Sequence, residues 1–260
     1  MVNLTIKEIG VKLTQAGRLK ANPLCIYGSE IIPENAVPIK MINRCIANAI
    51  FSLTIKKNIS ALYIGNNALE GCCPGGQAWL GYNTFLPMLK YFLSTGSERF
   101  RDGAAEFLIA TPDLAENRLK SIGKIVPLGK YIIIRKSDDL DEKNLDIKAF
   151  VCFGLSEQIR NLCSLAYFRP EKAFNIQVPW GPSCASFITY PADMVENGLK
   201  RSIIIGPTDP TGNNWFPENY LSMGIPFEIA KRMANDLNDS FITKRSEIAY
   251  PVKRKFINSE

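Results

Sequence analysis

Residues 131–167, YIIIRKSDDLDEKNLDIKAFVCFGLSEQIRNLCSLAY, contain each kind of segment that the rest of the chain repeats. Two β-rich apolar runs, 131–135 and 149–154, flank a polar stretch, and an amphipathic helical pattern follows at 156–167. Runs rich in β-branched and aromatic residues are typical of strands, whereas apolar residues three and four positions apart indicate a helix with one buried side. The stretch therefore predicts strands and helices that alternate within one layered fold.

The same alternation extends in both directions along the chain. Further β-rich runs lie at 24–28, 61–65, 106–110, 186–190 and 202–206, and further helical patterns lie at 3–19, 40–53, 77–93, 112–121 and 226–238. Pro112 and Pro226 stand near the first turn of two of these helices, a position that proline favours. We expect an α+β or α/β fold in which a mixed sheet of short strands carries amphipathic helices.

The chain of 260 residues is long enough for one domain or for two small lobes. The polar run Ser137–Lys143 is the only plausible lobe boundary in the sequence. We therefore expect a single domain over residues 1–260, with two lobes that meet near 137–148 as the alternative. Residues 244–260 are expected to form a basic, solvated tail. Nucleic-acid binding is disfavoured because the remaining positive charge is scattered.

The apolar and cysteine content indicates a cytoplasmic protein with reduced thiols. No window approaches the roughly 18 uninterrupted apolar residues that span a bilayer, and the N-terminus, MVNLTIKEIG, lacks an apolar signal core. The 7 cysteines are odd in number and spread over the chain, which favours free thiols over a disulfide framework. We expect a small molecule or a redox partner, and no membrane contact.

The sequence contains no histidine. Ser-His-Asp and Cys-His catalysis, His-ligated zinc and His-ligated haem are therefore excluded. A general acid or base must be Asp, Glu, Lys, Tyr or Cys, and a soft-metal site must rest on cysteine sulfur with carboxylate or methionine as helpers.

The least ordinary stretch is GCCPGGQAWLGY, residues 71–82, between a predicted strand and a predicted helix. If its proline or glycines open that helix, Cys73 stands near the first turn, where unpaired N–H groups and the helix dipole stabilise a thiolate. Gly75 and Gly76 let a ligand approach the backbone closely. A tight turn with incidental cysteines is an equally good interpretation. We name Cys73 as the candidate catalytic residue, and Gly75, Gly76 and Trp79 as candidate cofactor contacts.

A second cysteine, Cys184, precedes the apolar run 186–190 in the segment WGPSCAS. Taken alone, a buried packing role is favoured for it, because free cysteine behaves as a small apolar residue. Cys25, Cys152 and Cys163 lie within apolar runs, and we assign them to packing.

Several segments occur in a familiar order: NPLCIYGSE at 22–30, Arg44-Cys45, the turn Cys73-Pro74-Gly75-Gly76, Cys184, and GIPFE at 224–228. In this order they resemble domain-of-unknown-function family 169, an uncharacterised archaeal conserved region common in methanogens and anaerobic bacteria. The resemblance covers about residues 20 to 238, and only the Cys-Pro-Gly-Gly turn is a sharp motif. It implies no established activity, but it singles out Cys45, Cys73 and Cys184 as thiols at family positions.

Many relatives carry a further Gly-Cys pair after the last main strand, where this chain reads Gly206-Pro207-Thr208-Asp209. The resemblance therefore implies three sulfur ligands here rather than a closed set of four. Asp209 is a conceivable substitute ligand, although the surrounding prolines and glycine favour a turn.

Three functions stay open, and with them the question of whether the protein is an enzyme. The first is a metal or iron–sulfur protein in which Cys45, Cys73 and Cys184 converge as thiolates, within about 8 Å sulfur to sulfur. The anaerobic lineage that the resemblance implies favours an iron–sulfur cluster over zinc.

The second function is a thiol enzyme with Cys73 as nucleophile, activated by its helix start and by a nearby cation. Arg44, which is also a candidate cofactor contact, or Lys40 would supply that cation, and Tyr82 or Glu228 would move protons. The third is a non-catalytic binding module whose aromatic residues line a pocket for a flat or anionic ligand. Those aromatic residues are Trp79, Tyr82, Trp180 and Trp215.

Overall fold

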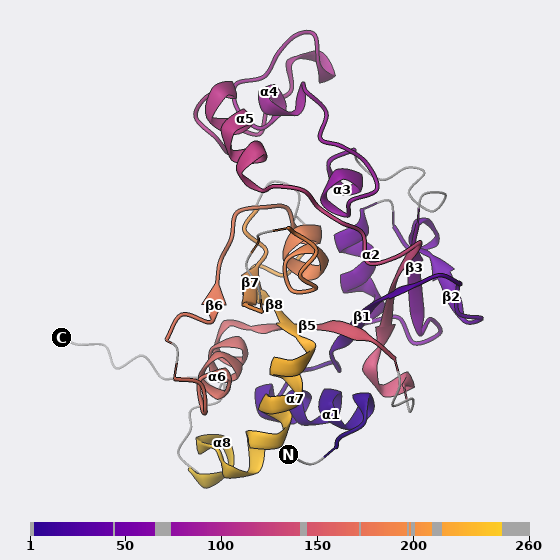
Figure 1. The fold of residues 1–260 in the computed structure, drawn as a ribbon, viewed down its shortest axis with the longest axis vertical. Coiled ribbons are helices and arrows are strands. Elements are labelled where there is room, and N and C mark those ends of the chain that lie inside the picture. Colours follow the sequence, from indigo (N-terminus) through magenta and orange to yellow (C-terminus); the bar gives the residue numbers. More distant parts are fainter. Residues whose placement is uncertain are drawn as a thin grey trace, which may run out of the picture.

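The computed structural model describes residues 3–43, 45–65, 74–140, 145–171, 173–196, 198, 201–209 and 215–245. Within these residues one sheet of eight strands has the order β2-β3-β4-β1-β5-β8-β7-β6 (Figure 1). The strands are β1 (Leu24–Ser29), β2 (Ala36–Pro38), β3 (Ala61–Ile64), β4 (Tyr131–Lys136), β5 (Ile147–Leu155), β6 (Ile176–Gln177), β7 (Ile203–Gly206) and β8 (Tyr220–Pro226). The pairs β2–β3 and β6–β7 are parallel, and the other neighbouring pairs are antiparallel. The predicted mixed sheet is confirmed, in an α+β arrangement.

Helices cover both faces of this sheet (Figure 1). One face, here called the α1 face, is covered by α1, α6 and α7; the other, the α2 face, is covered by α2 and a π-helix. The helices are α1 (Ile6–Gly17), α2 (Ile46–Leu53), α3 (Pro74–Trp79), α4 (Leu89–Phe92), α5 (Pro112–Ser121), α6 (Ser156–Ala166), the π-helix Ala185–Thr189, α7 (Phe227–Asp236) and α8 (Phe241–Lys244).

Side chains alternate along the strands and so separate two hydrophobic cores. On β1, Leu24 and Ile26 are buried in the core of the α2 face, whereas Cys25 and Tyr27 are buried in the core of the α1 face. Strand β5 is buried along most of its length, as expected for a strand that helices cover on both faces. The sheet therefore separates two hydrophobic cores, and only the core of the α2 face adjoins the site described below.

Residues 83–122 form a small unit, here called the cap, which projects from the α2 side of the molecule (Figure 1). The cap carries α4 and α5, and its own core contains Leu93, Ile109 and Ala115. Helix α5 begins where the sequence predicts, because Thr111 accepts a hydrogen bond from the Leu114 amide (3.2 Å) and a proline occupies the first turn.

The two ends of the cap meet at one place. A Cβ atom at Gly81 would lie 2.9 Å from the carbonyl oxygen of Ile125 and 2.8 Å from the nitrogen of Pro127. Ile125 also forms an isolated β-bridge with Val195 in the body of the protein. We call this meeting point of Gly81, Ile125 and Pro127 the cap junction.

The prediction of one helix over 77–93 is wrong. Helix α3 ends at Trp79, and Gly81 follows in the left-handed conformation with φ of +76°. Residues with a side chain rarely adopt this conformation, so the helix stops here. Helix α4 begins only at Leu89, after Pro87, which disfavours helical conformation in the residue that precedes it.

The strands predicted at 106–110 and 186–190 are also wrong. Segment 106–110 lies in the cap, where the amides of Glu106, Leu108 and Ile109 donate to carbonyls of residues 92–93 and not to a neighbouring strand. Residues 186–190 belong largely to the π-helix and are buried. A short apolar run that is buried on all sides does not reveal by its pattern whether it is a strand or a helix.

Strands β2, β6 and β8 have no counterpart among the predicted strands. Strand β8 contains Gly224 and Pro226, residue types that are depleted in strands. Its glycine is required by packing, since a Cβ atom at Gly224 would lie 2.6 Å from the Cγ of Pro191.

The link between β4 and β5 does not interrupt the sheet. Strands β4 and β5 lie on either side of β1, so one sheet continues across the link that the sequence suggested as a lobe boundary. Residues 141–144 of that link, and residues 246–260 of the basic tail, lie outside the described residues.

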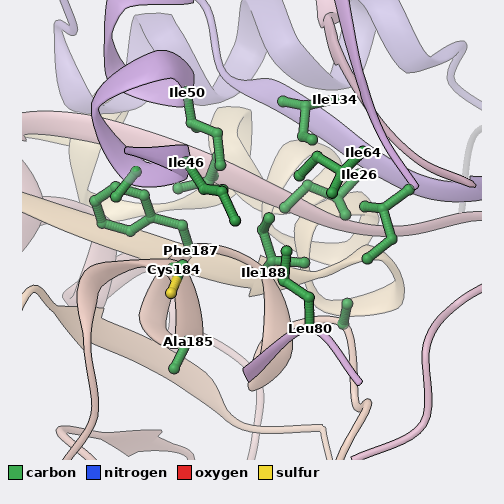
Figure 2. Packing of buried hydrophobic residues seen from close by; sticks show 14 of the residues in the cluster. Ile26, Ile46, Ile50, Ile64, Leu80, Ile134, Cys184, Ala185, Phe187 and Ile188 are labelled. Atoms are coloured by element: carbon green, nitrogen blue, oxygen red, sulfur yellow. The ribbon is translucent and has the colours of Figure 1, made fainter. Parts of the chain in front are cut away.

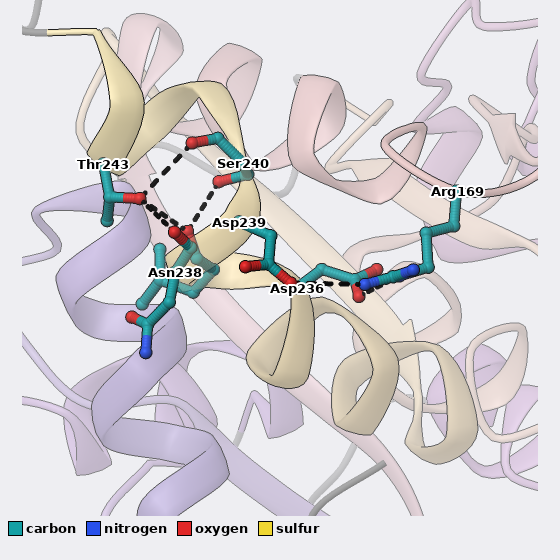
Figure 3. A network of polar contacts seen from close by, with 7 residues as sticks. Arg169, Asp236, Asn238, Asp239, Ser240 and Thr243 are labelled. Carbon is teal, nitrogen blue, oxygen red and sulfur yellow. Dashed lines mark hydrogen bonds and ion pairs between the residues drawn. The ribbon is translucent and has the colours of Figure 1, made fainter.

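A polar network fixes the end of α7 on the α1 face (Figure 3). The carboxylate of Asp236 is buried and forms an ion pair with Arg169, whose guanidinium also lies 3.5 Å from Asp239. A buried carboxylate is unfavourable unless it is paired. The pair therefore attaches the segment that follows α6 to the end of α7.

Candidate functional site

A cavity of about 410 Å³ lies between the cap and the body of the protein. The body supplies Gly75, Gly76, Trp79, Trp180, Gly181, Pro182, Cys184 and Asp209. The cap supplies Leu86, Leu89, Phe92, Leu93, Phe100, Arg101, Glu106 and Leu108. A concave site that is mostly apolar, with a few charged groups, is typical of small-molecule binding.

Hydrogen bonds fix the wall that the body supplies. The buried hydroxyl of Thr189, in the π-helix, donates to the carbonyl of Trp79 at the end of α3. The Thr208 hydroxyl lies 3.1 Å from the carbonyl oxygen of Gly181, which holds the loop after β7 against the same wall. Three segments that are distant in the sequence are thereby brought to one side of the cavity.

Two tryptophans form the largest apolar surface of the cavity. The rings of Trp79 and Trp180 meet edge to face with their centroids 6.1 Å apart, and Trp79 also contacts Phe85 of the cap at 5.4 Å. Trp180 packs against the cap core, and the Arg118 guanidinium lies 5.3 Å from its ring. Such aromatic pairs contribute about 0.5–1.5 kcal/mol each beyond burial, so they join the cap to the body and keep the aromatic surface rigid.

Cys184 belongs both to the cavity wall and to the hydrophobic core of the α2 face. The residue is only 6% exposed, and Figure 2 shows it next to Phe187 within that packed cluster. The sequence-predicted site residues that lie at the cavity are thus Gly75, Gly76, Trp79, Trp180, Cys184 and the conceivable substitute ligand Asp209.

The other predicted ligands and contacts lie elsewhere or outside the described residues. Cys45 is exposed and immediately precedes α2, where its amide donates to the side-chain oxygen of Asn43 (2.8 Å). Arg44, Cys72 and Cys73 lie outside the described residues. Within the part of the chain that is described, no three His, Cys, Asp or Glu side chains are grouped so as to hold a metal ion. The convergence of Cys45, Cys73 and Cys184 stays a prediction.

The three cysteines assigned to packing lie on the α1 face of the sheet. Burial raises the pKa of all three thiols, to about 12 for Cys152 and about 11 for Cys163, and well above the ordinary value for Cys25. These thiols are therefore protonated near neutral pH and separated by the sheet from the cavity.

The remaining residues of the enzyme and binding hypotheses do not line the cavity. The Tyr82 hydroxyl lies 3.3 Å from the Ile64 carbonyl oxygen, and burial raises its pKa far above the ordinary value of 10, which makes it a poor proton donor. Glu228 is exposed on α7, on the opposite face of the sheet. Trp215 packs against Phe51, with ring centroids 5.9 Å apart.

Sequence reasoning did not identify the residues that the cap contributes. A signal was present in the run FLPMLKYFL at 85–93, which is apolar on more sides than one packed helix face requires. An excess of this kind indicates a second apolar surface, which here is the wall of the cavity.

Fold and site together define an α+β protein with a capped, largely apolar cavity. The sequence profile of family DUF169, described as uncharacterised ArCR, matches residues 12–236. The chain belongs to this family, as the resemblance implied. No curated protein and no solved structure matches the chain. Among the described residues, no helix combines the length and the apolar character that crossing a membrane requires.

Proposed function

We propose that the protein binds a small, largely apolar molecule in the cavity between the cap and the body. The observation that carries this proposal is the cavity itself, about 410 Å³ with Trp79 and Trp180 in its wall. Its size lies within the roughly 300–1,000 Å³ of small-molecule sites. Flat aromatic surfaces offer a large contact area to a planar ligand.

Gly75 allows a direct test, because it lines the cavity and its missing side chain faces open space. A Cβ atom there would have no atom of the described residues within 4 Å. Because Gly75 lines the cavity, the ring of Gly75→Phe should reduce the space that a ligand can occupy there. We expect it to weaken binding of the neutral fluorophore N-phenyl-1-naphthylamine by at least about tenfold, equivalent to 1.4 kcal/mol.

The matched control is Gly75→Ala, which changes the backbone preference in the same way but leaves most of the cavity open. This variant should bind the fluorophore as the wild type does. Thermal unfolding of both variants checks that neither is destabilised. Wild-type protein that fails to bind the fluorophore, or Gly75→Phe that binds it normally, would count against the proposal.

A second candidate function is the thiolate-ligated metal or iron–sulfur site. One observation favours it: Cys184 lines the cavity together with Gly75 and Gly76, which follow Cys73 closely in the sequence. Cys45 is the third thiol of the set, and Cys73 doubles as the nucleophile if the protein is instead a thiol enzyme.

Anaerobic purification tests the metal site. Bound iron with broad absorption near about 400 nm is expected for a cluster, and zinc alone for a zinc site. Cys45→Ser, Cys73→Ser and Cys184→Ser should each lower the metal content. Cys163→Ser, on the other face of the sheet, is the matched control and should retain it. Colourless protein without bound iron or zinc would rule this candidate out.

We also propose a reducing, cytoplasmic location. It is supported by the cysteines that the structure describes, none of which is joined in a disulfide.

A further inference from the structure

We infer that the ligand of this cavity carries a single carboxylate, which Arg101 binds. The inference rests on the proposed function, because it adds one charged group to a ligand whose apolar part contacts the cavity walls. Arg101 is the one cation among the described residues that line the cavity.

The position of Arg101 suits it to bind an anion. Its guanidinium carbon lies 4.3 Å from the ring centroid of Phe92, another cavity residue. None of the ion pairs within the described part of the chain includes Arg101. An arginine that stacks on an aromatic ring keeps the N–H groups of its planar edge for a carboxylate, which it binds through two parallel hydrogen bonds.

The backbone around Arg101 is held in an unfavourable conformation. Arg101 and Asp102 both have φ of +54°, and Gly103 follows with φ of +81°. Left-handed conformation is unfavourable for residues with a Cβ atom, and two such residues in succession are rare. Backbone strain of this kind persists where the surrounding structure enforces it, commonly at ligand sites. Here the strained backbone sets the position of the Arg101 Cα atom, from which the side chain extends.

The other charged groups of the cavity favour a ligand with one negative charge over a ligand with several. Glu106 and Asp209 add two carboxylates to the lining. A ligand with several negative charges, such as a nucleotide or a dicarboxylate, would bring further anionic groups towards these carboxylates, whereas a monocarboxylate adds only the group that Arg101 pairs. The lining therefore fits an apolar, ring-bearing monocarboxylate.

Three naphthalene probes test this inference by titration calorimetry: naphthalene-2-carboxylate, the uncharged naphthalene-2-carboxamide, and naphthalene-2,6-dicarboxylate. Wild-type protein should bind the carboxylate about tenfold or more tighter than the carboxamide, and the dicarboxylate more weakly than the monocarboxylate. Arg101→Gln should abolish this preference without changing the affinity for the carboxamide.

Arg101→Lys keeps the charge but not the planar fork, so it should retain only part of the preference. Arg99→Gln removes an exposed arginine outside the cavity lining and should change nothing. If Arg101→Gln does not fold, by circular dichroism, the comparison of Arg101→Lys with the wild type decides the matter.

Equal binding of carboxylate and carboxamide by the wild type, or a preference that persists in Arg101→Gln, overturns the inference. In either case the proposed function stands if the carboxamide binds and Gly75→Phe blocks it. Wild-type protein that binds none of the probes overturns both.

Discussion

Three glycines allow the geometry of the cap junction to be tested quantitatively. Gly81 has φ of +76°, and a Cβ atom there would lie within 2.9 Å of the backbone of Ile125 and Pro127. Gly103 has φ of +81° but open space around the same position, and Gly75 has open space without a positive φ. Alanine at Gly81 therefore adds both backbone strain and a steric clash. At Gly103 it adds backbone strain alone, and at Gly75 it adds neither.

The expected stabilities follow from these differences. Left-handed conformation costs an alanine about 1–2 kcal/mol, and a clash with backbone that cannot move adds about 1–3 kcal/mol. Replacing any glycine also restricts the unfolded chain, which stabilises by about 0.4–1 kcal/mol. We expect Gly81→Ala to lose about 2–4 kcal/mol, Gly103→Ala to lose about 1 kcal/mol or less, and Gly75→Ala to be unchanged or slightly stabilised.

Urea unfolding measures the global free energies, and hydrogen exchange of cap amides detects opening of the cap alone. The Leu108 and Ile109 amides, which both donate to the Leu93 carbonyl at 3.0 Å, report on the cap. If Gly81→Ala matches Gly75→Ala by both measurements, the two ends of the cap do not meet as described.

Three further predictions concern other parts of the molecule. Arg169→Met leaves the buried Asp236 carboxylate without this ion-pair partner and should lower the free energy of unfolding by about 1–3 kcal/mol. The double variant Arg169→Met/Asp236→Asn should recover part of that loss. An Arg169→Met protein as stable as the wild type would contradict the role of the pair. Hydrogen bonds to Lys120 and Lys90 lower the pKa of Glu116 from 4.5 to about 2. A lowered carboxyl pKa stabilises the fold above the unfolded value, so the melting-temperature gap between wild type and Glu116→Gln should close as the pH falls from 4.5 towards 2; a gap that is constant with pH would refute this. Iodoacetamide at about pH 8 should alkylate exposed Cys45 in the native protein but not Cys152, whose pKa burial raises to about 12; peptide mass spectrometry reads the outcome.

The parts of the fold that were predictable are those whose local pattern agrees with their final environment. Helices α5, α6 and α7 have amphipathic sequences. Strands β4 and β5 are β-rich runs, and both lie in the interior of the sheet, next to β1. Segment 186–190 has the composition of a strand, but it is buried between the sheet and the cavity wall as a π-helix. Tertiary packing decides such a segment, because its apolar pattern is compatible with either structure.

The candidate site was predictable on one side only. The turn that contains Gly75 and Gly76, and the segment around Cys184, are unusual in the sequence itself, and the structure brings them to one cavity. Arg101 and Phe92 contribute from the cap, and neither belongs to a motif. These two residues reach the cavity because the chain leaves the body, forms the cap and returns. The spacing of residues within a short segment does not predict this path of the chain.

The position of the cap junction has a consequence for how the architecture can vary. Since the chain departs and returns at adjacent points, a cap of different length would join the same two anchors, and doubling such a loop costs only about 0.6 kcal/mol in closure entropy. The buried residues of the two sheet cores lie outside the cap, and the cap packs against the core of the α2 face through Phe85 and Ile122. A different cap that keeps these two apolar contacts would therefore remodel half of the cavity wall while the strands of the sheet keep their own core.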